Sequence, residues 1–366
     1  MLRIDFKKLI EELISTGIEM FLTNNKNIIV NNYNQYIILN EVLFMNFGKA
    51  VINNYDFSYF DNLLDEKHEK SVGKFINYLN ESNDILMGIS DNFIKTIDSI
   101  DFQLVPFWNI FRRYNEKDFK DVILGYFSTF GNDIYKIAKS YFDENRIHLG
   151  IVDYENYAGF YTGIPHTKTG YVFSTYEKYD SLNASIIAHE LGHAVDAHRF
   201  IFPQQKNTFL FADCLGEVPS STFEFGFVDY LKDNYIDIKG SSILENSKIF
   251  SLKDYMEKIN ETAKMNDVFV FPDGKAYGNE KQVFNLRDSI LYGLGYYFAL
   301  HLNLVKKSST KEFLDRLNTL ITSRYELSLE NMIEKIGFNV DDFISGKYIN
   351  DKISNDYMEL RKRYKF

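Results

Sequence analysis

The stretch "SIIAHELGHAVDAH", residues 185–198, constrains the fold of this chain more than any other segment. Its apolar residues recur at helical intervals around nearly the whole circumference, so the sequence predicts a helix that other elements cover on most sides. The same helix carries His189, Glu190 and His193. Two imidazoles and a carboxylate are costly to bury alone, so these three groups need partners.

The spacing of the three groups is that of a zinc site. On an α-helix, residues four apart lie on one face, so His189 and His193 can share one metal ion. Glu190 lies about 100° round the helix, where it can flank an attacking water without binding the metal. A chance match to His-Glu-x-x-His arises in roughly 1% of chains of this length. The alternative is that the three groups only hydrogen-bond to other groups of the core.

Catalytic zinc takes three protein ligands and keeps one position open, so a third ligand is needed. We expect it on a second helix, starting near Phe209 and carrying "ADCLGEVPSSTFEF". Asp213, Glu217 and Glu224 are spaced by one and two helical turns and can share a face. Pro219 either kinks this helix or marks its first turn. From the residues alone, all three acids remain candidates.

Composition limits the classes of protein to be considered. A hydrophobic share of 45% and a charged share of 25% are typical of a globular protein. The net charge is −10 and no basic stripe is present, which argues against a nucleic-acid partner. The single cysteine, Cys214, fits a reducing compartment. Neither a secretory signal nor a long apolar run is present, so we expect a cytoplasmic protein without a membrane span.

Helical periodicity dominates residues 3–145, and the character of the sequence changes near Asn145. The stretch 147–176 alternates β-formers with glycine-containing turns, which predicts two or more short strands just before the HELGH helix. Asp180 or Ser181 is the expected N-cap of that helix. A further long helix is expected from about 280 to 306.

We therefore predict a mainly α fold, with two helical lobes around a substrate cleft and a small β-sheet next to the HELGH helix. The change of character divides the chain into an N-terminal helical region, 1–147, and a catalytic region, 148–366. The alternative is one continuous domain, because no flexible linker marks the division.

"HELGH" and, after an interval of 23 residues, "EVPSSTFE" resemble the oligopeptidase M3 family of zinc peptidases, which includes thimet oligopeptidase and oligoendopeptidase F. The resemblance covers about 150–300 and includes "YGLGYY", which is similar to the family's tyrosine helix. It implies one zinc ion per chain, with Glu217 as the third ligand and Glu224 as support behind it. It also favours Tyr292 over Tyr296 as a donor to the oxyanion, against the alternative that both tyrosines only pack.

The chain departs from the family pattern at several points. The family's chains are longer, so the resemblance implies a shortened N-terminal region. Arg287 and Ala299 stand where the family often has a histidine and a tyrosine. His166, in the loop "TGIPHTKTG", either replaces the missing donor or is an ordinary surface residue. Arg287 either binds a peptide carboxylate or forms a surface salt bridge.

The expected function is that of a zinc metalloendopeptidase, an oligopeptidase-like hydrolase that cleaves short peptides. Glu190 acts as general base on a zinc-activated water, and zinc and Tyr292 stabilise the oxyanion. The strand near 170–175 is expected to be an edge strand that pairs with the substrate backbone. One alternative is a dedicated processing peptidase for one partner peptide. Another is a non-catalytic peptide-binding helical protein, but such a protein needs no general base, so the presence of Glu190 argues against it. The sequence does not determine the oligomeric state.

Overall fold

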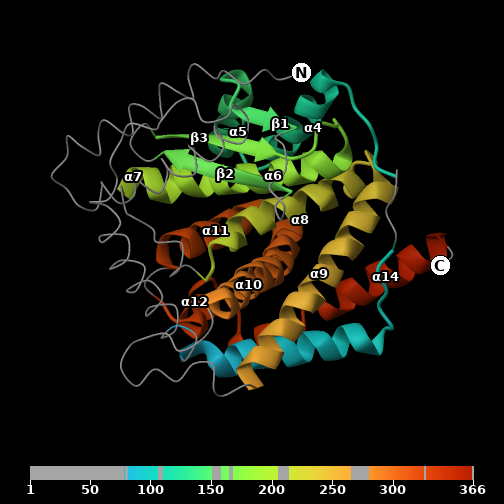
Figure 1. Ribbon diagram of the computed structural model, residues 1–366, viewed down its shortest axis with the longest axis vertical. Helices are drawn as coiled ribbons and strands as arrows, with labels where there is room; N and C mark the ends of the chain where they lie inside the picture. The colour runs from blue at the N-terminus through green and yellow to red at the C-terminus, as the bar shows by residue number, and fades with distance from the viewer. Residues whose placement is uncertain are drawn as a thin grey trace. The chain divides into compact units, whose positions relative to one another are not determined.

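The computed structural model describes the chain in eight segments, whose helices and strands are drawn in Figure 1. They cover residues 78, 81–105, 110–150, 158–164, 168–204, 214–264, 280–324 and 327–364. The chain forms two compact units, one made of residues 1–69 and 113–209 and the other of residues 70–112 and 210–366. Helices predominate among the described residues of both units, as predicted.

The first unit combines a small sheet with helices. Its elements are α4 (Glu116–Ser128), α5 (Asn132–Asp143), β1 (Ile147–Leu149), β2 (Gly159–Ile164), β3 (Thr169–Ser174), α6 (Ser181–Asp196), the π-helical turn η1 (Ala197–Ile201) and α7 (Phe202–Gln204). The strand order is β1-β3-β2, with β3 parallel to β1 and antiparallel to β2. Helix α6, which carries the HELGH sequence, packs against β2 and β3 (Figure 1). The predicted sheet beside this helix is confirmed.

The strand at 170–175 is the middle strand of the described sheet, so the expectation that it is an edge strand is wrong. Val172 of β3 lies opposite Ile147 of β1 on one side and Tyr161 of β2 on the other. β2 therefore covers the whole of one edge of β3, and β1 covers residues 172–174 of the other edge. The alternation of residues predicts where strands form, but their order depends on long-range pairing that leaves no local pattern.

Helix α6 is fixed at its start by a chain of polar contacts. It begins after the N-cap Asp180, whose carboxylate accepts a hydrogen bond from the Asn183 backbone N–H at 3.0 Å. The Asn183 side chain accepts from Ser174 Oγ at 2.7 Å and donates to the Lys178 carbonyl at 2.8 Å. These bonds tie the end of β3 to the first turn of α6. Nearly all residues of α6 are buried, as its apolar circumference predicts.

The second unit is helical in its described part. It contains a helical stretch at 81–99, α8 (Glu217–Asp233), α9 (Ile238–Lys264), α10 (Glu280–Ser308), α11 (Thr310–Ser323), α12 (Leu329–Lys335), α13 (Val340–Ile344) and α14 (Asn350–Tyr364). Helix α10 is central, because it packs against α8, α9 and α11. It corresponds to the long helix that was expected from about 280.

Helix α8 begins at Glu217 and not near Phe209, because residues 214–216 form a turn. Pro219 is the third residue of the helix, where its missing N–H costs no helical hydrogen bond. It therefore marks the first turn and does not kink the helix. The expected division at 147 is not among the boundaries of the compact units, and Ile147 begins a strand of the first unit. That division stays a prediction.

Several expectations lie outside the described residues. They include His166, Asp213 and the helix expected at the start of the chain. Arg287 lies within α10, and its side chain is not among those described. Within the described ranges, every helix is too short or too polar to span a bilayer. The cleft expected between two lobes stays a prediction.

Candidate metal centre

Helix α6 holds two imidazoles on one face, as the spacing predicts. The ring centroids of His189 and His193 are 5.1 Å apart, and the ring planes are nearly perpendicular at 77°. The His193 ring also stacks against Tyr161 of β2, with 6.4 Å between ring centroids. A side chain of the sheet thus lies against the His193 ring.

Glu217, the first residue of α8, is held at its carboxylate and at its backbone. Ser220 Oγ donates a hydrogen bond to Glu217 Oε2 at 2.9 Å and lies 3.0 Å from the Glu217 carbonyl oxygen. A helix N-terminus favours a negative charge because the backbone N–H groups point toward it. Gly295 of α10 packs directly on this turn, since a Cβ there would lie 2.9 Å from Glu217 Cβ.

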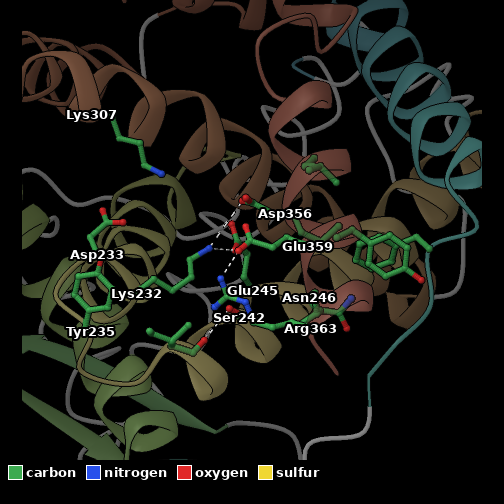
Figure 2. A pocket seen from close by; sticks show the side chains of 16 residues that line it. Lys232, Asp233, Tyr235, Ser242, Glu245, Asn246, Lys307, Asp356, Glu359 and Arg363 are labelled. Carbon is green, nitrogen blue, oxygen red and sulfur yellow. Dashed lines mark hydrogen bonds and ion pairs between the residues drawn. The ribbon is translucent and has the colours of Figure 1, made fainter. Parts of the chain in front are cut away.

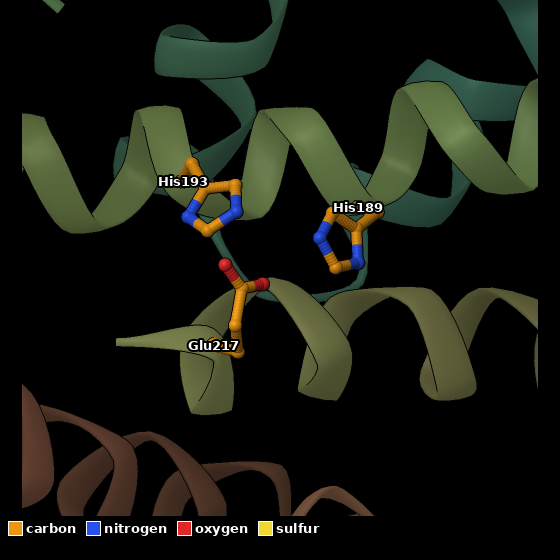
Figure 3. A group of neighbouring side chains, drawn as sticks. All are labelled: His189, His193 and Glu217. Carbon is orange, nitrogen blue, oxygen red and sulfur yellow. The ribbon is translucent and has the colours of Figure 1, made fainter. Parts of the chain in front are cut away.

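His189, His193 and Glu217 form a group that can hold a metal ion. Each offers one ligand atom, and these atoms all lie within 4.8 Å of one another (Figure 3). Two imidazole nitrogens and one carboxylate oxygen are a donor set that zinc accepts in catalytic sites. Of the candidate acids that the structure describes, Glu217 and Glu224, Glu217 is in this group, and Asp213 lies outside the described residues. Glu224 is instead paired with Lys248 of α9.

Glu190 lies on α6 beside the metal-ligand face and is buried, with 5% of its surface exposed. Strand β2 passes directly over its carboxylate. A Cβ at Gly159 would lie 2.6 Å from Ile186 Cγ2, 2.8 Å from the Phe173 carbonyl oxygen and 3.2 Å from Glu190 Oε1. Glycine is therefore the residue that lets the β2 backbone pass this close to the carboxylate.

Tyr292 and Tyr296 of α10 lie one turn apart, with 6.4 Å between ring centroids. A third tyrosine, Tyr255 of α9, contacts both of them. Burial raises the pKa of Tyr255 to about 12, and nearby acidic groups, Glu217 among them, act in the same direction. Burial, together with Glu224, also raises the pKa of Tyr296 well above its ordinary value. Tyr255 and Tyr296 therefore remain protonated at neutral pH and can donate hydrogen bonds.

Sequence reasoning missed Tyr255 and a second group of rings behind His193. The Tyr161 hydroxyl lies 3.0 Å from the Tyr141 hydroxyl, which in turn lies 3.4 Å from His198 Nε2. Burial lowers the pKa of His198 to about 4, so this ring is neutral at pH 7. Among the described residues, His198 is not part of the group that can hold a metal ion. With 26 tyrosines in the chain, no local signal singles out these few.

A cavity of about 370 Å³ in the second unit is lined by residues of α8, α9, α10 and α14 (Figure 2). Glu245 is one of the lining residues, and it is paired with Lys232 and Lys352. Burial alone would raise the pKa of Glu245, but the two ammonium groups outweigh it and hold that pKa below its ordinary value. Lys352 also donates to Asp356 at 2.9 Å. The two positive and two negative charges of this cluster balance, and its ion pairs join α8, α9 and α14.

Comparisons with known proteins give a limited result. The sequence matches no protein-family model and no curated protein. The fold is similar to that of a candidate oligoendopeptidase F from Bacillus anthracis str. Ames, with a TM-score of 0.46 and 12% identity over 93% of this chain and 65% of the other. The comparison with PZ peptidase A with an inhibitor has a TM-score of 0.46 and 12% identity, over 92% of this chain and 64% of the other. The comparison with a candidate peptidase from Chlamydophila abortus has a TM-score of 0.44 and 13% identity, over 92% of this chain and 61% of the other. The chain spans less than two thirds of the length of each.

Proposed function

We propose that this protein is a zinc-dependent metallopeptidase that hydrolyses short peptides, with one zinc ion per chain. The observation that carries the proposal is the group of ligand atoms from His189, His193 and Glu217, with Glu190 on the same helix as the two histidines. The donor set fits zinc, and Ser220 orients the carboxylate ligand. When bound, zinc supplies Lewis-acid chemistry, which acidifies water and polarises a peptide carbonyl.

The residues of the chain would divide the remaining work. Glu190 would take the proton of the attacking water and return it to the amine that leaves. The Tyr292 hydroxyl would donate a hydrogen bond to the oxyanion that forms from the carbonyl. Because β3 is central, backbone pairing with an extended peptide would fall to β2, an edge strand of the described sheet. Gly159 of β2 lies beside the Glu190 carboxylate, which supports this assignment.

Two alternatives keep parts of this arrangement. A dedicated processing peptidase would use the same chemistry on one partner peptide, and a broad peptide library would reveal it because few members would be cleaved. A non-catalytic peptide-binding protein would need neither the metal group nor a buried carboxylate at Glu190. The metal group therefore favours an enzyme over a binding module.

The test combines metal analysis with hydrolysis of a quenched-fluorescent peptide library. The purified protein should contain about one zinc per chain and cleave members of the library. Glu190→Gln removes a base but no ligand, so it should keep the zinc and the melting temperature. Its rate should fall by a factor of at least about 10². Wild-type rates from this variant, or a zinc-free protein that still cleaves peptides, would refute the proposal.

A further inference from the structure

Helix α10 carries two glycines that face different helices. Gly293 and Gly295 are two residues apart and so point about 200° away from each other around the helix. A Cβ at Gly295 would lie 2.9 Å from Glu217 Cβ and 3.1 Å from the Glu217 carbonyl oxygen, both on α8. A Cβ at Gly293 would lie 3.5 Å from Tyr255 Cβ and 3.1 Å from Ile259 Cδ1, both on α9.

At Gly295 the absence of a side chain lets α10 lie against the first turn of α8, and at Gly293 the same segment of α10 faces α9. The proposed metal ligand Glu217 stands at the first contact, and Tyr255 stands at the second. Both are thus placed relative to the same short stretch of α10, which also bears Tyr292.

The rings of Tyr255 and Tyr292 stack with nearly parallel planes. Their ring centroids are 5.7 Å apart, and the planes differ by 21°. Tyr296 meets both rings edge-on, at 6.1 Å from Tyr255 and 6.4 Å from Tyr292. Tyr255 and Tyr292 are both half-buried, so neither ring is held by a complete shell of core atoms. A half-buried ring that is stacked on one face and blocked at its edge has few other orientations.

We propose that Tyr255 is a positioning residue, whose ring holds the Tyr292 phenol in the orientation that the oxyanion requires. The inference rests on the proposed function, in which Tyr292 is the donor. A misplaced donor loses much of its value, because stabilisation of the oxyanion depends on a short and aligned hydrogen bond. The ring of Tyr255 matters for this role, and its hydroxyl does not.

This role makes predictions that differ from those of a packing residue or a second donor. Tyr255→Phe keeps the stacked ring and should retain kcat within about twofold. Tyr255→Leu removes the stack and should lower kcat by about tenfold with little change in KM. In a Tyr292→Phe background, the same Tyr255→Leu change should cost almost nothing more, because the donor it positions is already absent.

The experiment is a double-mutant cycle on kcat, with zinc content and melting temperature measured for every variant. Tyr255→Met, which also fills the site without an aromatic ring, serves as a second variant if Tyr255→Leu folds poorly. Equal losses from Tyr255→Leu in the wild-type and Tyr292→Phe backgrounds would overturn the proposal. So would a loss in Tyr255→Phe as large as that in Tyr255→Leu, since the hydroxyl would then be the active group.

A readout without activity separates this inference from the proposed function. With 3-fluorotyrosine at position 292, Tyr255→Leu should shift and broaden the fluorine resonance, and Tyr255→Phe should leave it near its wild-type position. An unmoved resonance in Tyr255→Leu would overturn the positioning role even in an active enzyme. Failure of the proposed function would appear differently, as a wild-type protein that cleaves no peptide or a fully active Glu190→Gln variant.

Discussion

Ser220 and Ser221 are neighbouring buried serines whose hydroxyls have different surroundings. Ser220 Oγ donates to the Glu217 carboxylate at 2.9 Å, whereas Ser221 Oγ has no hydrogen-bond partner among the described residues. Groups that orient a metal ligand typically contribute a factor of 10–100 in metal affinity. We therefore expect Ser220→Ala to weaken zinc binding by about tenfold or more. Ser221→Ala is the matched control and should bind zinc like the wild type.

Competition with a chromophoric chelator would measure both zinc affinities. If both variants bound zinc equally weakly, any change in the first turn of α8 would disturb the site. Ser220 would then have no specific role in orienting Glu217. Glu217→Ala, measured alongside, sets the scale because it removes a ligand and should lose most of the metal.

At the residue scale, the sequence predicts what local spacing determines. His189 and His193 follow from the helical period, and Glu190 follows from its place between them. Spacing alone left Glu217 as one of three acids, because the choice depends on where a second helix begins, and it was the family resemblance that selected Glu217. Tyr255 could not be found, since its contacts with α10 join segments almost 40 residues apart and leave no periodic trace.

At the scale of elements, the approach of α8 to α10 at Gly295 decides where Glu217 stands. Alanine at this position would place its Cβ 2.9 Å from Glu217 Cβ and 3.1 Å from the Glu217 carbonyl oxygen. Backbone atoms cannot yield as a flexible side chain can, so α8 must shift. The gain in helix propensity is about 1 kcal/mol, and overpacking costs about 1–3 kcal/mol. We expect Gly295→Ala to lose both stability and zinc affinity.

Gly293→Ala is the control for this change on the same helix. Its nearest neighbour would be Ile259 Cδ1 at 3.1 Å, the end of a side chain that can change rotamer. Zinc affinity should therefore stay close to the wild-type value in this variant. Chelator competition and thermal unfolding of both variants would check the expectation. A Gly295→Ala protein that binds zinc normally would show that the helices can separate without moving the ligand.

The elements themselves were largely predictable, and their partners were not. The N-cap Asp180, the burial of α6 and the extent of α10 follow from local rules of capping and periodicity. The strand near 170–175 was expected at an edge of the sheet, but β1 pairs with its other side and makes it the middle strand. Glycine at 159 reads locally as a turn signal, but it serves the close passage of β2 over Glu190.

At the scale of the whole molecule, the mainly helical class with a small sheet was predictable from the distribution of periodicities. The make-up of the two compact units was not. Residues 70–112 belong with 210–366, and residues 113–209 stand between them in the sequence. A pass along the chain looks for one change of composition at one boundary. Local composition cannot reveal that segments far apart in the sequence belong to one unit, because the contacts between them form only when the chain folds.

The core of the second unit contains a histidine that should make stability depend on pH. His301 of α10 is 1% exposed, and neither ring nitrogen has a hydrogen-bond partner among the described residues. Its ring stacks on Phe343 at 4.2 Å between centroids and packs against Tyr297 and Phe338. Burial lowers the pKa of His301 to about 3, so the folded protein keeps this ring neutral.

The sign of the effect follows from which state binds the proton. Below about pH 6.5 an unfolded histidine is protonated, whereas folded His301 is not, so the unfolded state binds more protons and stability falls as the pH falls. The contribution is fully present above pH 6.5 and is lost progressively down to about pH 3. At pH 4.5 the loss is about 2–3 kcal/mol, since each unit of pKa difference corresponds to about 1.4 kcal/mol.

His301→Leu removes this titration and leaves an apolar side chain in the aromatic cluster. The free energy of unfolding in urea should therefore fall less steeply between pH 7 and 4.5 in the variant. Other buried histidines, such as His148, titrate in both proteins and cancel in the difference. Parallel stability curves for the two proteins would show that His301 is protonated in the folded state, against its apolar surroundings.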